Sequence, residues 1–125
     1  MAFIAIIDDD PDIVEATSLL LQSRGHKTVT ACTADEGYGV VKSQHPDLII
    51  LDVMMIEPDD GFFLANKFRR EGVTTPIIML TSVSKAFGYQ FGTSEMVPTD
   101  VFLEKPVSSA LLLEKIESLL AKEKV

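Results

Sequence analysis

The feature that most constrains the fold of this chain is a series of short apolar runs separated by segments with helical patterns. Residues 3–7, 48–51 and 77–80 are almost continuously apolar, and residues 27–32 and 101–103 are weaker runs of the same kind. Near-continuous apolar runs of this length are typical of strands that are covered on both faces. Helical segments that alternate with such strands predict an α/β fold, in which a parallel sheet with right-handed crossovers carries helices on both faces.

Start and stop signals define the helices between these strands. The Asp-Pro pair at residues 10–11 is typical of a helix cap followed by the first helical position, and Gly25 is typical of a helix end. Residues 33–36 (TADE) form a capping box that opens a second helix. A third helix is expected from a cap at Asp60 to a stop at Gly72, and a fourth after Pro106.

The composition limits the classes of protein to which the chain can belong. With 125 residues, of which 46% are hydrophobic and 24% charged, the chain is expected to form one globular domain over residues 1–125. A net charge of −8 without a basic stripe argues against nucleic-acid binding. The N-terminal apolar run has neither the length of a membrane span nor the flanks of a signal peptide. The single cysteine, Cys32, is expected to be a small buried strand residue, and one cysteine is consistent with a reducing compartment, so we expect a cytoplasmic protein.

Polar residues follow four of the five predicted strands at the point where each strand ends. In a parallel α/β sheet these ends meet at one edge, where ligands bind. Asp8, Asp9 and Asp52 would form an all-oxygen site suited to Mg²⁺, which would offset the repulsion among their charges. Thr81 and Lys105 would add a hydroxyl and a cation beside a phosphoryl group, and Asp52 could act as the nucleophile that accepts it.

Four motifs at these positions, in this order, resemble those of the response-regulator receiver domains of two-component signalling. They are IIDDDPDI (6–13), LIILDVMM (48–55), IIMLTS (77–82) and FLEKP (102–106). The resemblance covers essentially the whole chain and is to the chemotaxis-regulator type. It implies a flavodoxin-like, doubly wound fold with a five-stranded sheet in the order 2-1-3-4-5. It further implies a stand-alone receiver without an output domain, since no residues are left for one.

The resemblance also implies roles for individual residues. Asp52 would be phosphorylated by a sensor histidine kinase or a histidine phosphotransfer protein, and Thr81 and Lys105 would contact the phosphoryl group. Mg²⁺ would be bound by the carboxylates of Asp8, Asp9 and Asp52 and by the backbone carbonyl of Met54. Phe102 would be the aromatic switch whose rotamer follows Thr81, although a Phe in a short strand is as readily explained as core. The chain would signal through a downstream protein and would not be an enzyme with turnover.

Residues 84–100 depart most from the receiver pattern. The segment SKAFGYQFGTSEMVPTD contains two glycines and a proline, so the helix that receivers have here is expected to be short or missing. Its three aromatic residues either pack down in place of that helix or form a partner-binding patch.

Other functions fit the sequence less well. The main alternative is a pseudo-receiver, a protein-binding module that keeps the fold but is never phosphorylated. A phosphohydrolase of the haloacid dehalogenase type would need a second Asp two residues after its nucleophile, where this chain has Met54. A DNA-binding regulator would need a helix-turn-helix segment, which the sequence lacks.

Overall fold

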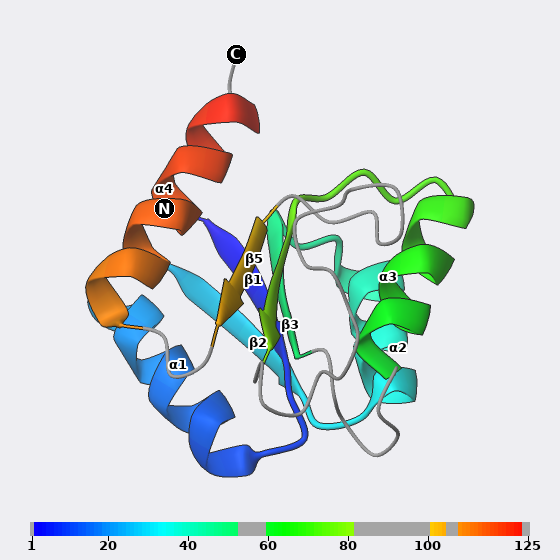
Figure 1. The fold of residues 1–125 in the computed structure, drawn as a ribbon, viewed down its shortest axis with the longest axis horizontal. Helices are drawn as coiled ribbons and strands as arrows, with labels where there is room; N and C mark the ends of the chain where they lie inside the picture. The colour runs from blue at the N-terminus through cyan, green and yellow to red at the C-terminus, as the bar shows by residue number, and fades with distance from the viewer. Residues whose placement is uncertain (1, 53–59, 82–100, 105–107, 124–125) are drawn as a thin grey trace.

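The computed structural model contains a five-stranded sheet in which every pair of neighbouring strands is parallel, in the order β2-β1-β3-β4-β5 (Figure 1). The strands are β1 (Phe3–Ile7), β2 (Lys27–Ala31), β3 (Leu48–Asp52), β4 (Ile77–Thr81) and β5 (Val101–Glu104). The structure describes residues 2–52, 60–81, 101–104 and 108–123. The predicted flavodoxin-like fold and its strand order are confirmed.

Helices cover both faces of the sheet. They are α1 (Pro11–Ser23), α2 (Ala34–Gln44), α3 (Asp60–Arg70) and α4 (Ser109–Glu123). Helices α1 and α4 lie on one face, and α2 and α3 lie side by side on the other (Figure 1). None of the helices in the described part of the chain is long and apolar enough to cross a membrane.

Each face of the sheet has its own apolar core, and the strands contribute to both. In β1, Ala5 and Ile7 pack in the core beneath α2 and α3, together with Phe68 of α3. Ile4 and Ile6 of the same strand point to the opposite core, beneath α1 and α4. Because successive side chains of a strand point to opposite faces, a strand covered on both sides must be apolar at every position. This explains the continuous apolar runs of the sequence.

The starts of α1 and α2 and the ends of α1 and α3 form as the sequence predicts. Asp10 caps α1, and its side chain accepts a hydrogen bond of 3.0 Å from the backbone N–H of Asp12. Thr33 caps α2 by accepting from the N–H of Glu36 at 3.1 Å, while the Glu36 carboxylate accepts from the N–H of Cys32 at 2.7 Å. Two glycines with positive φ follow α1 and α3, namely Gly25 (87°) and Gly72 (86°).

Some expectations differ from the structure or lie outside its described part. The prediction that Cys32 is buried is wrong: β2 ends at Ala31, and the side chain of Cys32 is exposed in the turn before α2. Asp60 is the first residue of α3 and not the residue before it. The predicted short or missing helix within residues 84–100 lies outside the described residues.

Candidate functional site

The register of the two central strands brings two of the predicted acids together. In the parallel pair β1–β3, Ile7 lies opposite Leu51. The next residue along each chain is an aspartate, Asp8 after β1 and Asp52 as the last residue of β3. Two residues that are remote in sequence thus become neighbours at the carboxyl edge of the sheet, and Asp9 follows Asp8 at the same edge.

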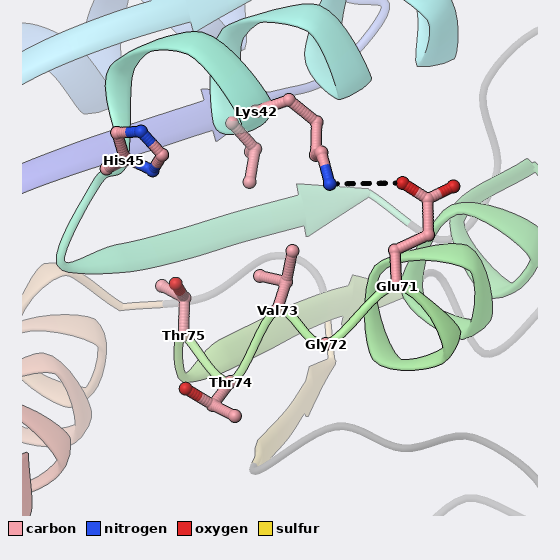
Figure 2. Close-up of a pocket in the computed structure, with 8 residues that line it drawn as sticks. Lys42, His45, Glu71, Gly72, Val73, Thr74 and Thr75 are labelled. Atoms are coloured by element: carbon pink, nitrogen blue, oxygen red, sulfur yellow. Dashed lines mark ion pairs between the residues drawn. The ribbon is translucent and has the colours of Figure 1, made fainter.

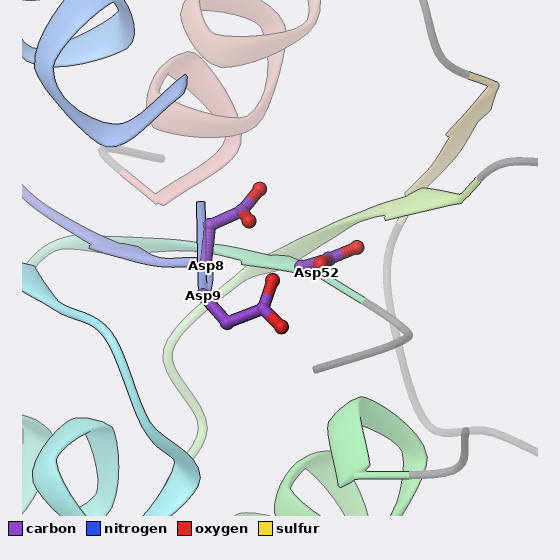
Figure 3. A group of neighbouring side chains, drawn as sticks. All are labelled: Asp8, Asp9 and Asp52. Atoms are coloured by element: carbon purple, nitrogen blue, oxygen red, sulfur yellow. The ribbon is translucent and has the colours of Figure 1, made fainter. Parts of the chain in front are cut away.

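The three carboxylates form one compact cluster. Asp8, Asp9 and Asp52 each offer an oxygen atom, and these oxygens lie within 4.8 Å of one another (Figure 3). The residues differ in exposure, because Asp8 and Asp52 are only 2% and 6% exposed whereas Asp9 is exposed. Asp8 and Asp52 therefore line the inner side of the cluster, and Asp9 lies on its solvent side.

The turn between β1 and α1 holds Asp8 in position. Its Oδ1 accepts a hydrogen bond of 3.0 Å from the backbone N–H of Asp10, which is the cap of α1. The backbone N–H of Asp8 donates to the carbonyl of Ala31 at the end of β2, at 3.1 Å. A short Asp side chain that accepts from the N–H two residues later is a common turn device. This contact places the carboxylate beside the N-terminus of α1, where negative charge is favourable.

The donor set fits a hard divalent cation. All three groups offer oxygen, and Mg²⁺ binds through one or a few carboxylates while it keeps several waters. Two of the acids are buried, and buried carboxylates in proteins are paired with a cation or hydrogen-bonded. The exposure of Asp9 leaves one side of the cluster accessible. The roles of these residues as metal ligands, and of Asp52 as phosphoacceptor, stay predictions.

The other predicted site residues are placed in part or not at all. Thr81 is the last residue of β4, next to β3, so its backbone lies at the same edge as Asp52. Phe102 lies in β5 opposite Met79 of β4. The side chains of Thr81 and Phe102, and the whole of Met54 and Lys105, lie outside the described residues.

The sequence did not indicate how Asp8 is oriented. Asp10 was expected to cap a helix, but its N–H also binds the Asp8 carboxylate. The signal that could have predicted this Asx turn is the spacing of Asp8 and Asp10, two residues apart, directly before Pro11 at the start of the helix.

A hollow of about 310 Å³ lies away from the acidic cluster (Figure 2). It is lined in part by His45, which follows α2, and by residues 72–75, which precede β4. These segments lie at the amino ends of β3 and β4, so the hollow is at the opposite edge of the sheet from Asp52. It does not belong to the candidate site.

Comparisons with known proteins indicate the family of the chain. The family model of the response regulator receiver domain matches residues 4–117. The transcriptional regulatory protein AfsQ1 of Streptomyces coelicolor is 33% identical over 120 residues, which are 96% of this chain and 52% of AfsQ1. The protein PilH of Pseudomonas aeruginosa is 27% identical over 97% of this chain and 99% of its own length. The chain thus spans about half the length of AfsQ1 but nearly all of PilH.

A solved structure gives the same result. The response regulator TrrA of Thermotoga maritima, in complex with Mg²⁺ and BeF, matches with a TM-score of 0.80 and 29% identity over 95% of this chain and 99% of TrrA. Sequence and fold therefore match those of known proteins along almost the whole length of the chain. The chain belongs to the response regulator receiver domain family.

Proposed function

We propose that this protein is a phosphorylation switch in which Asp52 accepts a phosphoryl group from a histidine kinase or a histidine phosphotransfer protein. The observation that carries the proposal is the cluster of Asp8, Asp9 and Asp52, whose oxygens lie within 4.8 Å of one another at the carboxyl edge of the sheet. Receiver domains are signalling switches, and the similarity to the receiver family model and to PilH along most of the chain supports the proposal.

The proposed chemistry is the transfer of a phosphoryl group from the donor histidine to Asp52. An oxygen of Asp52 forms a bond to the phosphorus of the donor as the bond from phosphorus to the donor imidazole nitrogen breaks. The leaving nitrogen keeps the bonding electron pair and takes up a proton from solvent. Mg²⁺, if held at the cluster, would supply positive charge that offsets the charge on the transferred oxygens. Asp8 and Asp9 would hold that ion together with Asp52 and the backbone carbonyl of Met54, and the N–H of Asp10 keeps Asp8 in place.

The same proposal assigns the response to the β4–β5 side of the molecule. Thr81 and Lys105 would contact the phosphoryl group, and Phe102 would change rotamer when Thr81 moves. The backbones of Thr81 and Phe102 lie on the paired strands β4 and β5, which supports a coupling between them. Phosphorylation would shift an equilibrium between two conformations, and a downstream protein would bind one of them. We place this switch in the cytoplasm, since its single cysteine, Cys32, is free and exposed, which suits a reducing compartment.

The experiment is an intact-mass measurement after incubation with acetyl phosphate and Mg²⁺. We expect one added phosphoryl group on the unmodified sequence, and none on Asp52→Asn or after chelation of the metal. Glu15→Gln is the matched control, because Glu15 is an exposed acid of α1 outside the cluster, and it should be phosphorylated normally.

A folded protein that gains no phosphoryl group under these conditions would contradict the proposal. That result would favour the pseudo-receiver, a binding module with the same fold.

A further inference from the structure

A second feature of the molecule lies between the N-terminal half of α2 and helix α3, on the face of the sheet that these helices cover. A shallow hollow of about 170 Å³ is open there. Its lining includes Asp35 and Tyr38 from α2 and Phe63, Lys67 and Arg70 from α3. None of these residues belongs to the acidic cluster of the candidate site. We call this hollow the α2–α3 groove.

Phe63 is the most exposed large apolar side chain in the described part of the chain. It is 69% exposed, compared with 59% for Leu19 and 39% for Leu111. A single exposed apolar residue is ordinary, but Phe63 lies at the border of a hollow that also contains the ring of Tyr38. Aromatic side chains in such a position are typical of the anchor regions of protein interfaces.

The α3 side of the groove is basic, in contrast to the chain as a whole. Phe63, Lys67 and Arg70 are spaced four and three residues apart, so they share one face of α3. The last turn of α3 holds three of the eleven Lys and Arg residues of a chain whose net charge is −8. Arg69 does not face outward with them, because its Nη1 donates to the carbonyls of Val73 at 2.8 Å and Thr75 at 2.9 Å.

The two remaining cations are available to a ligand. The Nζ of Lys67 lies 4.1 Å from the centroid of the Tyr38 ring, which holds it over the groove. Arg70 is exposed and forms no ion pair with another described residue. Among the described residues that line the groove, Asp35 at the start of α2 is the one acid, so the two cations outnumber it.

Contacts with neighbouring side chains hold Tyr38 in the wall of the groove. The Tyr38 ring stacks on Phe68, with the ring centroids 6.1 Å apart and the planes 6° from parallel. Its hydroxyl donates to Oε1 of Glu71 at 2.5 Å, and Lys42 of α2 pairs with the same oxygen at 3.1 Å (Figure 2). The hydrogen bond from Tyr38, followed by that from Lys42, lowers the pKa of Glu71. A preformed surface of this kind loses little conformational entropy on binding.

We propose that the α2–α3 groove docks an acidic amphipathic segment of a partner protein. An apolar side chain of that segment would fill the hollow against Phe63 and Tyr38, and its carboxylates would pair with Lys67 and Arg70. The apolar contact would supply most of the affinity, and the charges would select the partner, since exposed ion pairs contribute little by themselves. The groove would bind its partner whether or not Asp52 is phosphorylated.

The test uses the full chain, labelled with ¹⁵N, in buffer without Mg²⁺ or phosphodonor, so a failure of phosphorylation has no bearing on it. The probe is a short synthetic amphipathic helix with a Leu row flanked by Glu, and the comparison peptide has Lys at every Glu position. We expect the acidic peptide to shift the amide signals of residues 34–38 and 63–70, and the basic peptide to leave them unchanged. Raising the salt concentration should weaken the binding.

Variants locate the binding and separate its two components. Phe63→Ala should weaken binding by about tenfold, and Arg70→Glu by about fivefold or more. Leu19→Ala is the matched control, because Leu19 is a similarly exposed apolar residue on α1, and it should bind as the original chain does. All three substitutions are at exposed positions, so circular dichroism should show the same fold.

Three results would overturn the proposal. One is that neither peptide, or both peptides equally, shifts the groove signals. Another is that Phe63→Ala and Leu19→Ala weaken binding to the same extent. The third is that the groove signals shift with protein concentration in the absence of peptide, which would make a second copy of this chain the occupant.

Discussion

The acidic cluster gives a prediction for Asp52→Asn that does not depend on phosphorylation. Asp8, Asp9 and Asp52 each offer a carboxylate oxygen, and these oxygens lie within 4.8 Å of one another. Two unit charges at that distance repel each other by about 1 kcal/mol in water and by about 3–4 kcal/mol at an effective dielectric constant of about 20. Asp8 and Asp52 are both buried, so their repulsion lies above the water limit. In the absence of divalent metal, we expect Asp52→Asn to raise the free energy of unfolding by about 1–3 kcal/mol.

Added Mg²⁺ should reduce or reverse the difference in the free energy of unfolding between Asp52→Asn and the original chain. An ion that binds only the folded state stabilises it by about 2.7 kcal/mol when its free concentration is about 100 times its Kd. The original chain should gain stability in this way, whereas Asp52→Asn has lost a charged ligand and should gain less. The assay is urea denaturation followed by circular dichroism, with EDTA or with Mg²⁺, and with NaCl added so that ionic strength is equal. Glu15→Gln, outside the cluster, should follow the original chain within about 0.5 kcal/mol in both conditions.

Either of two results would refute this reasoning. If Asp52→Asn is less stable than the original chain in EDTA, the carboxylate of Asp52 makes net favourable interactions in the folded state, and repulsion does not dominate. If Mg²⁺ stabilises the original chain no more than NaCl does, the cluster does not hold the cation.

Three further predictions follow from the packing and the helix ends. A Cβ on Gly37 would lie 2.8 Å from two side-chain carbons of Ile7, whereas one on Gly39 would meet nothing within 4 Å. Gly39→Ala should therefore raise the free energy of unfolding by about 0.5–1 kcal/mol. In urea denaturation, the free energy of unfolding of Gly37→Ala should be at least about 1 kcal/mol lower than that of Gly39→Ala. Equal values for the two variants would contradict the packing argument. Thr33→Ala should lower the helical stability of α2 and cost about 1 kcal/mol in the same assay, while Thr33→Ser should cost less, because Ser keeps the capping oxygen. Burial lowers the pKa of His26, whose Nδ1 accepts a backbone N–H, so folding favours the neutral ring. The stability that the neutral His26 ring contributes should be complete above the unfolded pKa of about 6.5, and it should decrease as the pH falls toward the lower pKa of the folded state. His26→Asn should make the free energy of unfolding less dependent on pH in this range. If the pH dependence of this variant equals that of the original chain, His26 does not contribute in this way.

Much of the fold could be predicted from the sequence because its signals are local. The apolar runs of β1, β3 and β4 mark strands covered on both faces, and the alternation with helices implies a parallel sheet. Helix ends were predictable because a cap depends on residues that are two or three apart, as at Asp10 and Thr33. Burial was less predictable. The expectation for Cys32 failed because it depends on where β2 ends, and strand ends are weakly marked.

The part of the candidate site that depends only on the topology of the sheet could also be predicted from the sequence. A parallel sheet brings all strand ends to one edge, so the sequence by itself determined that Asp8, Asp9 and Asp52 lie at that edge. It could not determine their spacing. The tertiary structure decided that Ile7 pairs with Leu51, and this register is what brings the oxygens within 4.8 Å.

Contacts between α2 and α3 were decided by the tertiary structure alone. The exposure of Phe63, the position of Lys67 over Tyr38 and the bridge through Glu71 all depend on how these two helices pack together. The physical reason is the range of the interactions. Strands and helix caps are specified by neighbours along the chain, whereas a register or a groove depends on residues that approach one another only after the chain has folded.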